Sequence, residues 1–287
     1  MWPDDFVRCL EESTTATSRV AEAIEIKERH LPKRIYKYRC DTDHARANLK
    51  ANTVWMASPE SYNDPYDSSF VFPLETLKNL LELALARKLK EAGHDVGMEV
   101  IRNKAASGIR HIAEATVSQF AAFRKFAKVC SFSERNDSLL MWSHYANHHK
   151  GFCIEYNIEV LSAGDFFRKN LYPVFYSEQF YDLGSFIQSL AGPSREDFRS
   201  MIPLLAMLHK FEGWKYEEEW RLVDEKDRIA DDYSRVSPPP SRVFLGARFD
   251  LSAGSKLLAI SRDRNIAVSQ MRLGDDRFVL HSQELGA

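Results

Sequence analysis

Apolar and polar side chains alternate along residues 214–223, Trp-Lys-Tyr-Glu-Glu-Glu-Trp-Arg-Leu-Val. Aromatic and β-branched residues at every second position predict a β-strand, because successive side chains of a strand point to opposite faces. We predict that Glu217, Glu219 and Arg221 share one face of this strand and that Trp220 faces the core on the other. Two carboxylates and a guanidinium would then lie side by side. The same pattern is also typical of an exposed strand whose charges serve solubility alone.

The rest of the chain shows the same alternation in short runs, with helical spacing of the apolar positions between them. We expect strands at 34–39, 54–58, 128–133, 151–156, 171–176, 243–246, 256–261, 268–273 and 278–280, and helices at 6–31, 43–51, 139–146 and 198–210. Residues 224–241 are charged and rich in proline, so we expect a loop there. Asp41 or Thr42 is a suitable N-cap for the helix 43–51.

Between residues 74 and 128 the apolar positions follow helical spacing, and the leucines form a stripe that is typical of packing. We therefore predict an α+β fold with a mixed, mostly antiparallel sheet core and a helical insertion at about 74–128. Residues 1–30 would form an N-terminal helical arm, and residues 31–287 a single domain.

The composition is that of a globular protein, with 44% hydrophobic and 28% charged residues and a formal net charge of -2. Nothing in this balance indicates a general affinity for nucleic acid. The four cysteines lack CxxC spacing, which suits a reducing compartment. The first residues, Met-Trp-Pro-Asp-Asp, are not typical of a signal peptide, and no apolar run approaches the ~18 residues of a membrane span. We expect a cytoplasmic protein that does not engage a membrane.

Several catalytic motifs are missing from the sequence. The chain contains no GxxxxGK[ST], no GxGxxG after a predicted strand and no GxSxG, so three large enzyme classes are excluded. His144, His148 and His149 have a spacing that can place two imidazoles on one helix face. Because no HExxH glutamate accompanies them, a polar helix end explains them better than a metal site does.

Four runs of the sequence together resemble a bacterial family catalogued as domain of unknown function 2971. The resemblance extends from about residue 31 to residue 280, and the family name implies no function. The runs are Tyr-Lys-Tyr-Arg at 36–39, Trp-Met-Ala-Ser-Pro-Glu-Ser-Tyr-Asn-Asp-Pro-Tyr-Asp at 55–67, the block from Cys-Ser-Phe-Ser at 130 to Cys-Ile-Glu-Tyr at 156, and Trp-Lys-Tyr-Glu-Glu-Glu-Trp-Arg at 214–221.

More distantly, the chain resembles ADP-ribosyltransferase toxins of the DNA-targeting type. Those enzymes carry a basic or aromatic residue on a first strand, a small hydroxyl residue on a second strand and a glutamate on a late strand. The chain offers, in this order, Tyr36, Tyr38 or Arg39, then Ser58, then Glu219 with Glu217 two residues ahead. This hypothesis requires Arg39 and Glu219 to lie on the same side of the protein, beside one cleft.

The resemblance implies a reaction that consumes NAD. Glu219 would stabilise the oxocarbenium-like state as nicotinamide leaves, and Glu217 would meet the acceptor. Arg39 would neutralise the pyrophosphate while a tyrosine stacks on nicotinamide. The acceptor is open among nucleic acid, protein and water, and no metal is expected. The resemblance also implies a toxin or phage-defence setting, with a possible antitoxin or defence-system partner.

The turn Asn-Asp-Pro-Tyr-Asp at 63–67 follows the second predicted strand. Loops that follow strands often carry function, so we expect Asn63 and Asp67 to border the same cleft. Asp67 would pair with a cation such as Arg39 or Arg221, and Arg221 is itself a candidate cofactor-binding residue.

Two other functions remain open from the sequence. A magnesium-dependent nuclease could use carboxylates as oxygen ligands, although the lysine that usually follows the strand glutamate is Arg221 here. The nuclease ligands would be Asp64, Asp67, Glu217 and Glu219. A sensor or interaction module could instead use Arg39, Arg221 and acidic residues of this set as a structural ion network.

Overall fold

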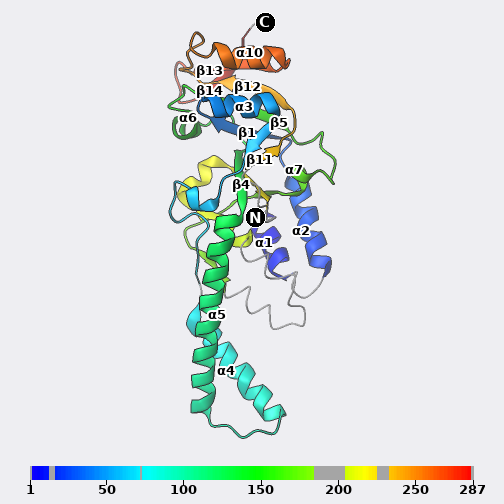
Figure 1. The fold of residues 1–287 in the computed structure, drawn as a ribbon, viewed down its shortest axis with the longest axis vertical. Coiled ribbons are helices and arrows are strands. Elements are labelled where there is room, and N and C mark those ends of the chain that lie inside the picture. The colour runs from blue at the N-terminus through cyan, green and yellow to red at the C-terminus, as the bar shows by residue number, and fades with distance from the viewer. Residues whose placement is uncertain (1, 13–16, 72, 184–203, 225–232, 286–287) are drawn as a thin grey trace. The chain divides into compact units, whose positions relative to one another are not determined.

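The computed structural model describes residues 2–12, 17–71, 73–183, 204–224 and 233–285 (Figure 1). The chain divides into two compact units. The first unit comprises Met1–Arg29, Tyr62–Phe126 and Ser177–Phe211, and the second comprises His30–Ser61, Ala127–Tyr176 and Glu212–Ala287. The N-terminal arm thus groups with the helical insertion, whereas we had expected residues 31–287 to form one domain.

The second unit is built on an eight-stranded sheet in the order β14-β13-β12-β5-β1-β4-β10-β6. Every pairing between these neighbours is antiparallel except that of β12 with β13, which is parallel. The predicted α+β fold with a mixed, mostly antiparallel sheet is therefore confirmed. The strands are β1 (Arg34–Arg39), β4 (Lys128–Ser133), β5 (Phe152–Asn157), β6 (Leu171–Pro173), β10 (Glu219–Asp224), β12 (Pro240–Leu245), β13 (Ala267–Leu273) and β14 (Leu280–Glu284).

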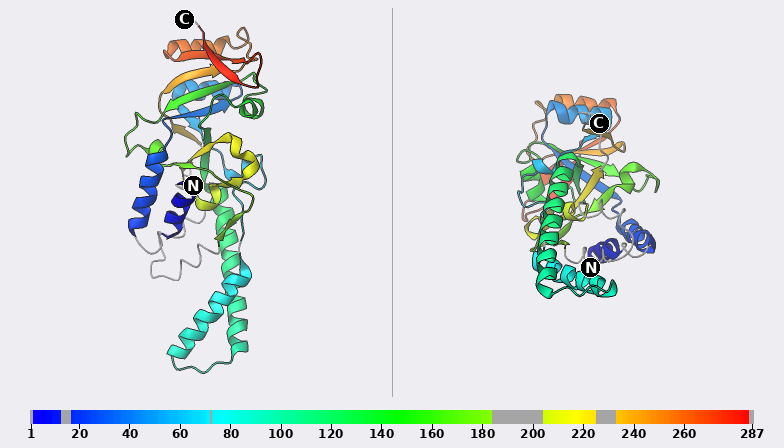
Figure 2. Two further views of the ribbon diagram at one scale, coloured as in Figure 1. Left: turned by 180° about the vertical axis from the view of Figure 1, so that it is seen from behind. Right: turned by 60° about the horizontal axis from the view of Figure 1, so that its bottom comes forward.

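Four helices of this unit pack around the sheet: α3 (Asp43–Ala51), α6 (Leu139–Tyr145), α7 (Phe166–Lys169) and α10 (Ser255–Asp263). Thr42 caps α3 as predicted, with its Oγ1 accepting a hydrogen bond from the Ala45 amide at 3.2 Å. In both figures α3 and α10 lie side by side (Figures 1 and 2). The strand predicted at 256–261 is wrong, because this segment is α10 and its buried residues, Leu257 and Ser261, recur at helical spacing.

Short strands complete the second unit. β2 (Thr53–Trp55) pairs with β11 (Ser234–Val236), so the predicted loop 224–241 contains a strand and the beginning of β12. Residues 225–232 of that loop lie outside the described residues. The strand predicted at 54–58 ends early, and a single bridge from Ala57 to Val129 replaces its last part. Ser58 directly precedes the 3₁₀ turn η1 (Pro59–Ser61).

The first unit contains the helices α1 (Trp2–Glu12), α4 (Leu74–Glu91) and α5 (Met98–Phe126), and most of α2 (Thr17–His30). The predicted helical insertion is confirmed as α4 and α5, which pack against each other (Figure 2). Gly108 permits a close approach, since a Cβ atom there would lie 3.1 Å from Leu81 Cδ2. None of the described helices is long and apolar enough to cross a membrane.

The remaining short strands are β3 (Phe70–Val71), β7 (Phe175–Ser177), β8 (Tyr181–Asp182) and β9 (His209–Phe211). β3 and β8 pair in parallel. The helix predicted at 198–210 is partly wrong, because residues 204–207 are helical but 209–211 form β9. Residues 198–203 of that prediction lie outside the described part of the chain.

Candidate functional site

The strand predicted within residues 214–223 begins only at Glu219. Residues Glu212–Glu217 form the 3₁₀ helix η2, and Glu218 joins it to β10 with a φ of 43°. A non-glycine residue in the left-handed region marks a sharp change of chain direction. The prediction that Glu217 shares a strand face with Glu219 is therefore wrong, although Glu219 and Arg221 do share one.

All six residues of β10 are buried, which rules out the exposed strand that the alternating pattern also allowed. Trp220 and Leu222 are almost wholly inaccessible on one face, as predicted. On the other face the carboxylate of Glu219 and the guanidinium of Arg221 form a forked pair, with N–O distances of 2.8 Å and 3.2 Å. The two side chains are 3% and 1% exposed.

The strand register brings three chemically useful side chains into one row. Tyr36 on β1 lies opposite Ser133 on β4, and Ser133 lies opposite Glu219 on β10. Residues directly opposite each other on neighbouring strands point to the same face of a sheet. A phenol, a hydroxyl and a carboxylate from three distant parts of the sequence therefore share one face.

This register separates the candidates for the first-strand residue. Tyr36 and Tyr38 lie two positions apart and share the face of Glu219, whereas the alternation of the strand places Arg39 on the opposite face. The requirement that Arg39 lie on the side of Glu219 is not met. The form of the transferase hypothesis that uses Arg39 is therefore contradicted, and only the form with Tyr36 or Tyr38 as the first-strand residue remains.

Ser58 does not belong to this row, because it lies between β2 and η1. Its carbonyl accepts hydrogen bonds from the backbone and the side chain of Ser61, and its Oγ lies 3.4 Å from the Glu60 amide. These contacts hold the turn that follows β2. Ser133 supplies the hydroxyl beside Glu219 instead, and the sequence signal for it was the alternation in the run Cys-Ser-Phe-Ser.

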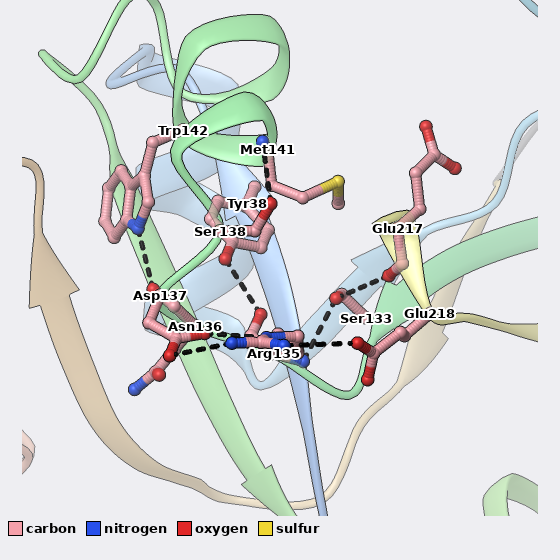
Figure 3. A network of polar contacts seen from close by, with 10 residues as sticks. All are labelled: Tyr38, Ser133, Arg135, Asn136, Asp137, Ser138, Met141, Trp142, Glu217 and Glu218. Carbon is pink, nitrogen blue, oxygen red and sulfur yellow. Dashed lines mark hydrogen bonds and ion pairs between the residues drawn. The ribbon is translucent and has the colours of Figure 1, made fainter. Parts of the chain in front are cut away.

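Ser133 fixes the position of Glu217. Its fully buried hydroxyl donates a hydrogen bond of 2.6 Å to the Glu217 carbonyl and accepts one of 3.1 Å from the Arg135 amide. Figure 3 shows that the Glu217 carboxylate points away from the network around Arg135. That carboxylate accepts a hydrogen bond of 2.6 Å from the Tyr145 hydroxyl.

An aromatic patch surrounds the Tyr145 side of Glu217. The rings of Trp214 and Tyr216 lie 6.0 Å apart, and His144 lies 6.4 Å and 6.3 Å from them. Trp214, Tyr145 and Tyr216 are partly buried and His144 is exposed. We call these four residues the η2 aromatic patch. Such rings offer flat apolar surfaces for a planar ligand.

The loop after Ser133 is held by its neighbours (Figure 3). Arg135 forms two short contacts with Asp137, at 2.8 Å and 3.1 Å, and a longer one of 3.4 Å with Glu218. The Tyr38 hydroxyl donates to the Arg135 carbonyl at 2.8 Å, and the Trp142 indole donates to the next carbonyl at 2.7 Å. Tyr38 is thus engaged in positioning this loop.

Glu155 is a functional candidate that sequence reasoning missed. It lies opposite Tyr36 on β5, and its carboxylate accepts hydrogen bonds from the Tyr36 hydroxyl at 3.2 Å and from Ser241 at 2.7 Å. Burial, and then the charge of Glu155, raise the pKa of Tyr36 to about 12. Tyr36 therefore remains a neutral hydrogen-bond donor at physiological pH.

The turn at 63–67 belongs to the first unit. There Asp67 is buried, accepts a hydrogen bond from Ser68 at 2.8 Å and lies 3.8 Å from the Lys210 ammonium. Lys210 is thus a cationic neighbour of Asp67 within the first unit. The pairing of Asp67 with Arg39 or Arg221 stays a prediction. Asn63 is exposed.

The four carboxylates of the nuclease hypothesis are divided between the units, with Asp64 and Asp67 in the first and Glu217 and Glu219 in the second. Across the described residues, no three His, Cys, Asp or Glu side chains are grouped so as to hold a metal ion. This applies to the histidines at 144, 148 and 149 as well. His149 contacts the Ser143 hydroxyl at 3.1 Å instead.

Residues 141–222 match the model of a family described as Protein of unknown function (DUF2971). The match supports the resemblance to that family over this part of the chain, which includes η2 and most of α6 and β10. It gives no support to the resemblance to ADP-ribosyltransferases. Comparison with curated proteins and comparison with solved structures each gave no match.

Proposed function

We propose that the second unit binds NAD⁺ and breaks its nicotinamide–ribose bond, passing ADP-ribose to an acceptor or to water. The observation that carries this proposal is the row of Tyr36, Ser133 and Glu219 on three adjacent strands, with Glu217 two residues before Glu219. A tyrosine, a small hydroxyl residue and a late-strand glutamate are the set that the resemblance to ADP-ribosyltransferases implies. Here Ser133 takes the place expected for Ser58.

The chemistry needs a fixed negative charge near the sugar. As the bond between ribose C1′ and the nicotinamide nitrogen breaks, its electron pair leaves with nicotinamide and positive charge develops on the ribose. A carboxylate held in place before the reaction stabilises that charge without reorganising. We assign the stabilisation of this charge to Glu219, because the forked contact with Arg221 holds its carboxylate in one orientation.

The second half of the reaction requires a nucleophile. Water or an acceptor group attacks C1′ and loses a proton, so that hydrolysis yields ADP-ribose, nicotinamide and one proton. Glu217 would orient the acceptor group through its carboxylate, which accepts a hydrogen bond from the Tyr145 hydroxyl. The η2 aromatic patch would hold the nicotinamide ring by stacking. The acceptor class, protein or nucleic acid, and a cytoplasmic toxin or defence setting belong to the same proposal.

The direct test is to incubate the purified full chain with NAD⁺ and to measure free nicotinamide by chromatography. Parallel reactions contain buffer alone, single-stranded DNA or a protein mixture, and use NAD⁺ labelled in its adenylate half. We expect nicotinamide release in at least one condition, with label on the acceptor where transfer occurs. Failure to release nicotinamide in all of them would reject the proposal.

A non-enzymatic function is the second candidate, and the buried pair of Glu219 and Arg221 favours it. Both charges are almost completely removed from water, and such pairs fix a unique arrangement in some proteins without adding much stability. In that case the pair of Glu219 and Arg221 would be part of a structural ion network in an interaction module. The variants described in the Discussion separate the two functions.

A further inference from the structure

A pocket of about 290 Å³ lies in the first unit, apart from the residues assigned to NAD⁺. Three segments line it: the turn around Tyr66, the stretch 177–180 and the strand β9. Its volume is at the lower end of the range for small-molecule sites, about 300–1,000 Å³. A pocket of this size accommodates one ring system with few substituents.

Local hydrogen bonds hold each wall of this pocket. The Tyr66 amide donates to the Asp64 carboxylate at 2.8 Å, and the Gln179 amide donates to the Ser177 hydroxyl at 2.9 Å. A backbone hydrogen bond of 3.3 Å from Ser68 to His209 joins the first wall to the third. Walls that are fixed before binding reduce the entropy cost of ordering a ligand.

The rim of the pocket consists of exposed aromatic side chains. Tyr66, Phe180 and Phe211 are 65%, 50% and 54% exposed. The rings of Tyr66 and Phe180 lie 5.7 Å apart with an angle of 32° between their planes. Large rings gathered in solvent around a pocket mark an interaction site more often than packing does. Flat rings in this arrangement are suited to stacking on another flat ring.

The polar groups of the pocket can form hydrogen bonds with the edge of a flat ring. Lys210 is a lining residue, and its ammonium lies 3.8 Å from Asp67, so the positive charge on that wall is balanced. Ser69 and Gln179 add a hydroxyl and an amide, which can each donate and accept hydrogen bonds. Glu178 and His209 also line the pocket, and the exposed Glu178 carboxylate can accept a hydrogen bond from an amino group on a base. A nucleobase presents both donors and acceptors on the edge of a flat neutral ring.

We propose that this pocket binds a nucleobase, stacked against the aromatic rim and hydrogen-bonded along its edge. The base can come from a free nucleoside or from an unpaired position of a nucleic acid strand, since both present the same ring. The site is independent of the proposed NAD⁺ chemistry, because no residue of the β10 row contributes to it.

Isothermal titration calorimetry of the full chain tests the proposal. The probes are adenosine, guanosine, cytidine and uridine, a short oligodeoxyadenylate, and ribose as the control without a base. We expect binding of at least one nucleoside or of the oligonucleotide, and none of ribose. The relative affinities of the nucleoside and the oligonucleotide identify the source of the base. Absence of binding by every base-containing probe would overturn the proposal.

Variants then locate the binding. Tyr66→Ala and Phe180→Ala truncate exposed rings and are not expected to disturb folding. Each should weaken binding by at least about 5-fold, since stacking of a base on an aromatic side chain contributes that much or more. Phe278→Ala is the matched control, because Phe278 is 97% exposed and is not a lining residue. Equal affinities for all three variants would place the ligand elsewhere and refute the site.

Discussion

Two ion networks meet at the beginning of β10, and consecutive glutamates belong to different ones. Glu218 faces Arg135, whose side chain also contacts Asp137, and these side chains are 43%, 48% and 41% exposed. Glu219 faces Arg221, and that pair is almost wholly buried. The same chemical groups are thus placed in water in one network and in the protein interior in the other.

The difference shows that burial, and not residue type, decides what each glutamate does. Exposed ion pairs contribute about 0–1 kcal/mol, because water and salt screen the charges. A buried pair has lost its hydration, so removal of one partner leaves a buried charge that has lost the compensation of that partner. The left-handed backbone conformation of Glu218 explains this difference in burial, because it directs the side chains of Glu218 and Glu219 toward different surroundings.

The largest effect on stability is expected from Arg221→Met. The variant leaves the Glu219 carboxylate buried beside an apolar side chain, which should cost about 3–5 kcal/mol of unfolding free energy. Chemical denaturation followed by circular dichroism measures this cost. The double variant Glu219→Gln/Arg221→Met should recover most of it, and a double variant as unstable as the single one would show that the pair is not what stabilises this region.

A small effect is expected from Arg135→Gln in the exposed network. The change should cost less than about 1 kcal/mol, and the cost should fall further at high salt because the charges are screened. Urea denaturation at low and high salt concentration provides the comparison. A cost as large as that of Arg221→Met would contradict the assignment of the two networks to different environments.

The smallest effect is expected at Glu134, which lies between the networks. Its carboxylate accepts a hydrogen bond from the Trp220 indole, yet burial raises its pKa above the usual 4.5. A carboxyl group with a raised folded-state pKa lowers stability once the pH exceeds its unfolded-state pKa. Glu134→Gln should therefore raise the melting temperature slightly at pH 7, with the gain vanishing below about pH 4.5. A variant that is less stable at pH 7 would contradict this sign.

Local patterning was sufficient for the strands and helices whose apolar positions have an unambiguous period. The bounds of β1, β4 and α3 match the predicted ranges, and the cap at Thr42 is in place. It failed for α10, where a short apolar run fits a strand or a helix equally well. It also failed for η2, because the aromatic residues of 214–216 alternate like a strand but lie in a 3₁₀ helix.

The candidate site depended on contacts that no local pattern specifies. Glu219 and Arg221 share a face because they are two residues apart on a strand, and this was predicted. The row of Tyr36, Ser133 and Glu219 depends on the register of three strands that are distant in the sequence. The same holds for the hydrogen bond from Tyr145 to Glu217.

The central claim is that the charge of Glu219 is required for cleavage of NAD⁺ and not only for folding. The most direct measurement is the rate of nicotinamide release by Glu219→Gln/Arg221→Met, beside Glu217→Gln and Glu218→Gln, with each variant shown to be folded at the assay temperature. We expect the double variant to lose at least about 100-fold in rate, as sites lose when one charge-stabilising contact is removed. Glu217→Gln should keep hydrolysis but impair transfer, and Glu218→Gln should match the parent. A folded double variant that releases nicotinamide at the parent rate would show that the pair on β10 is structural alone.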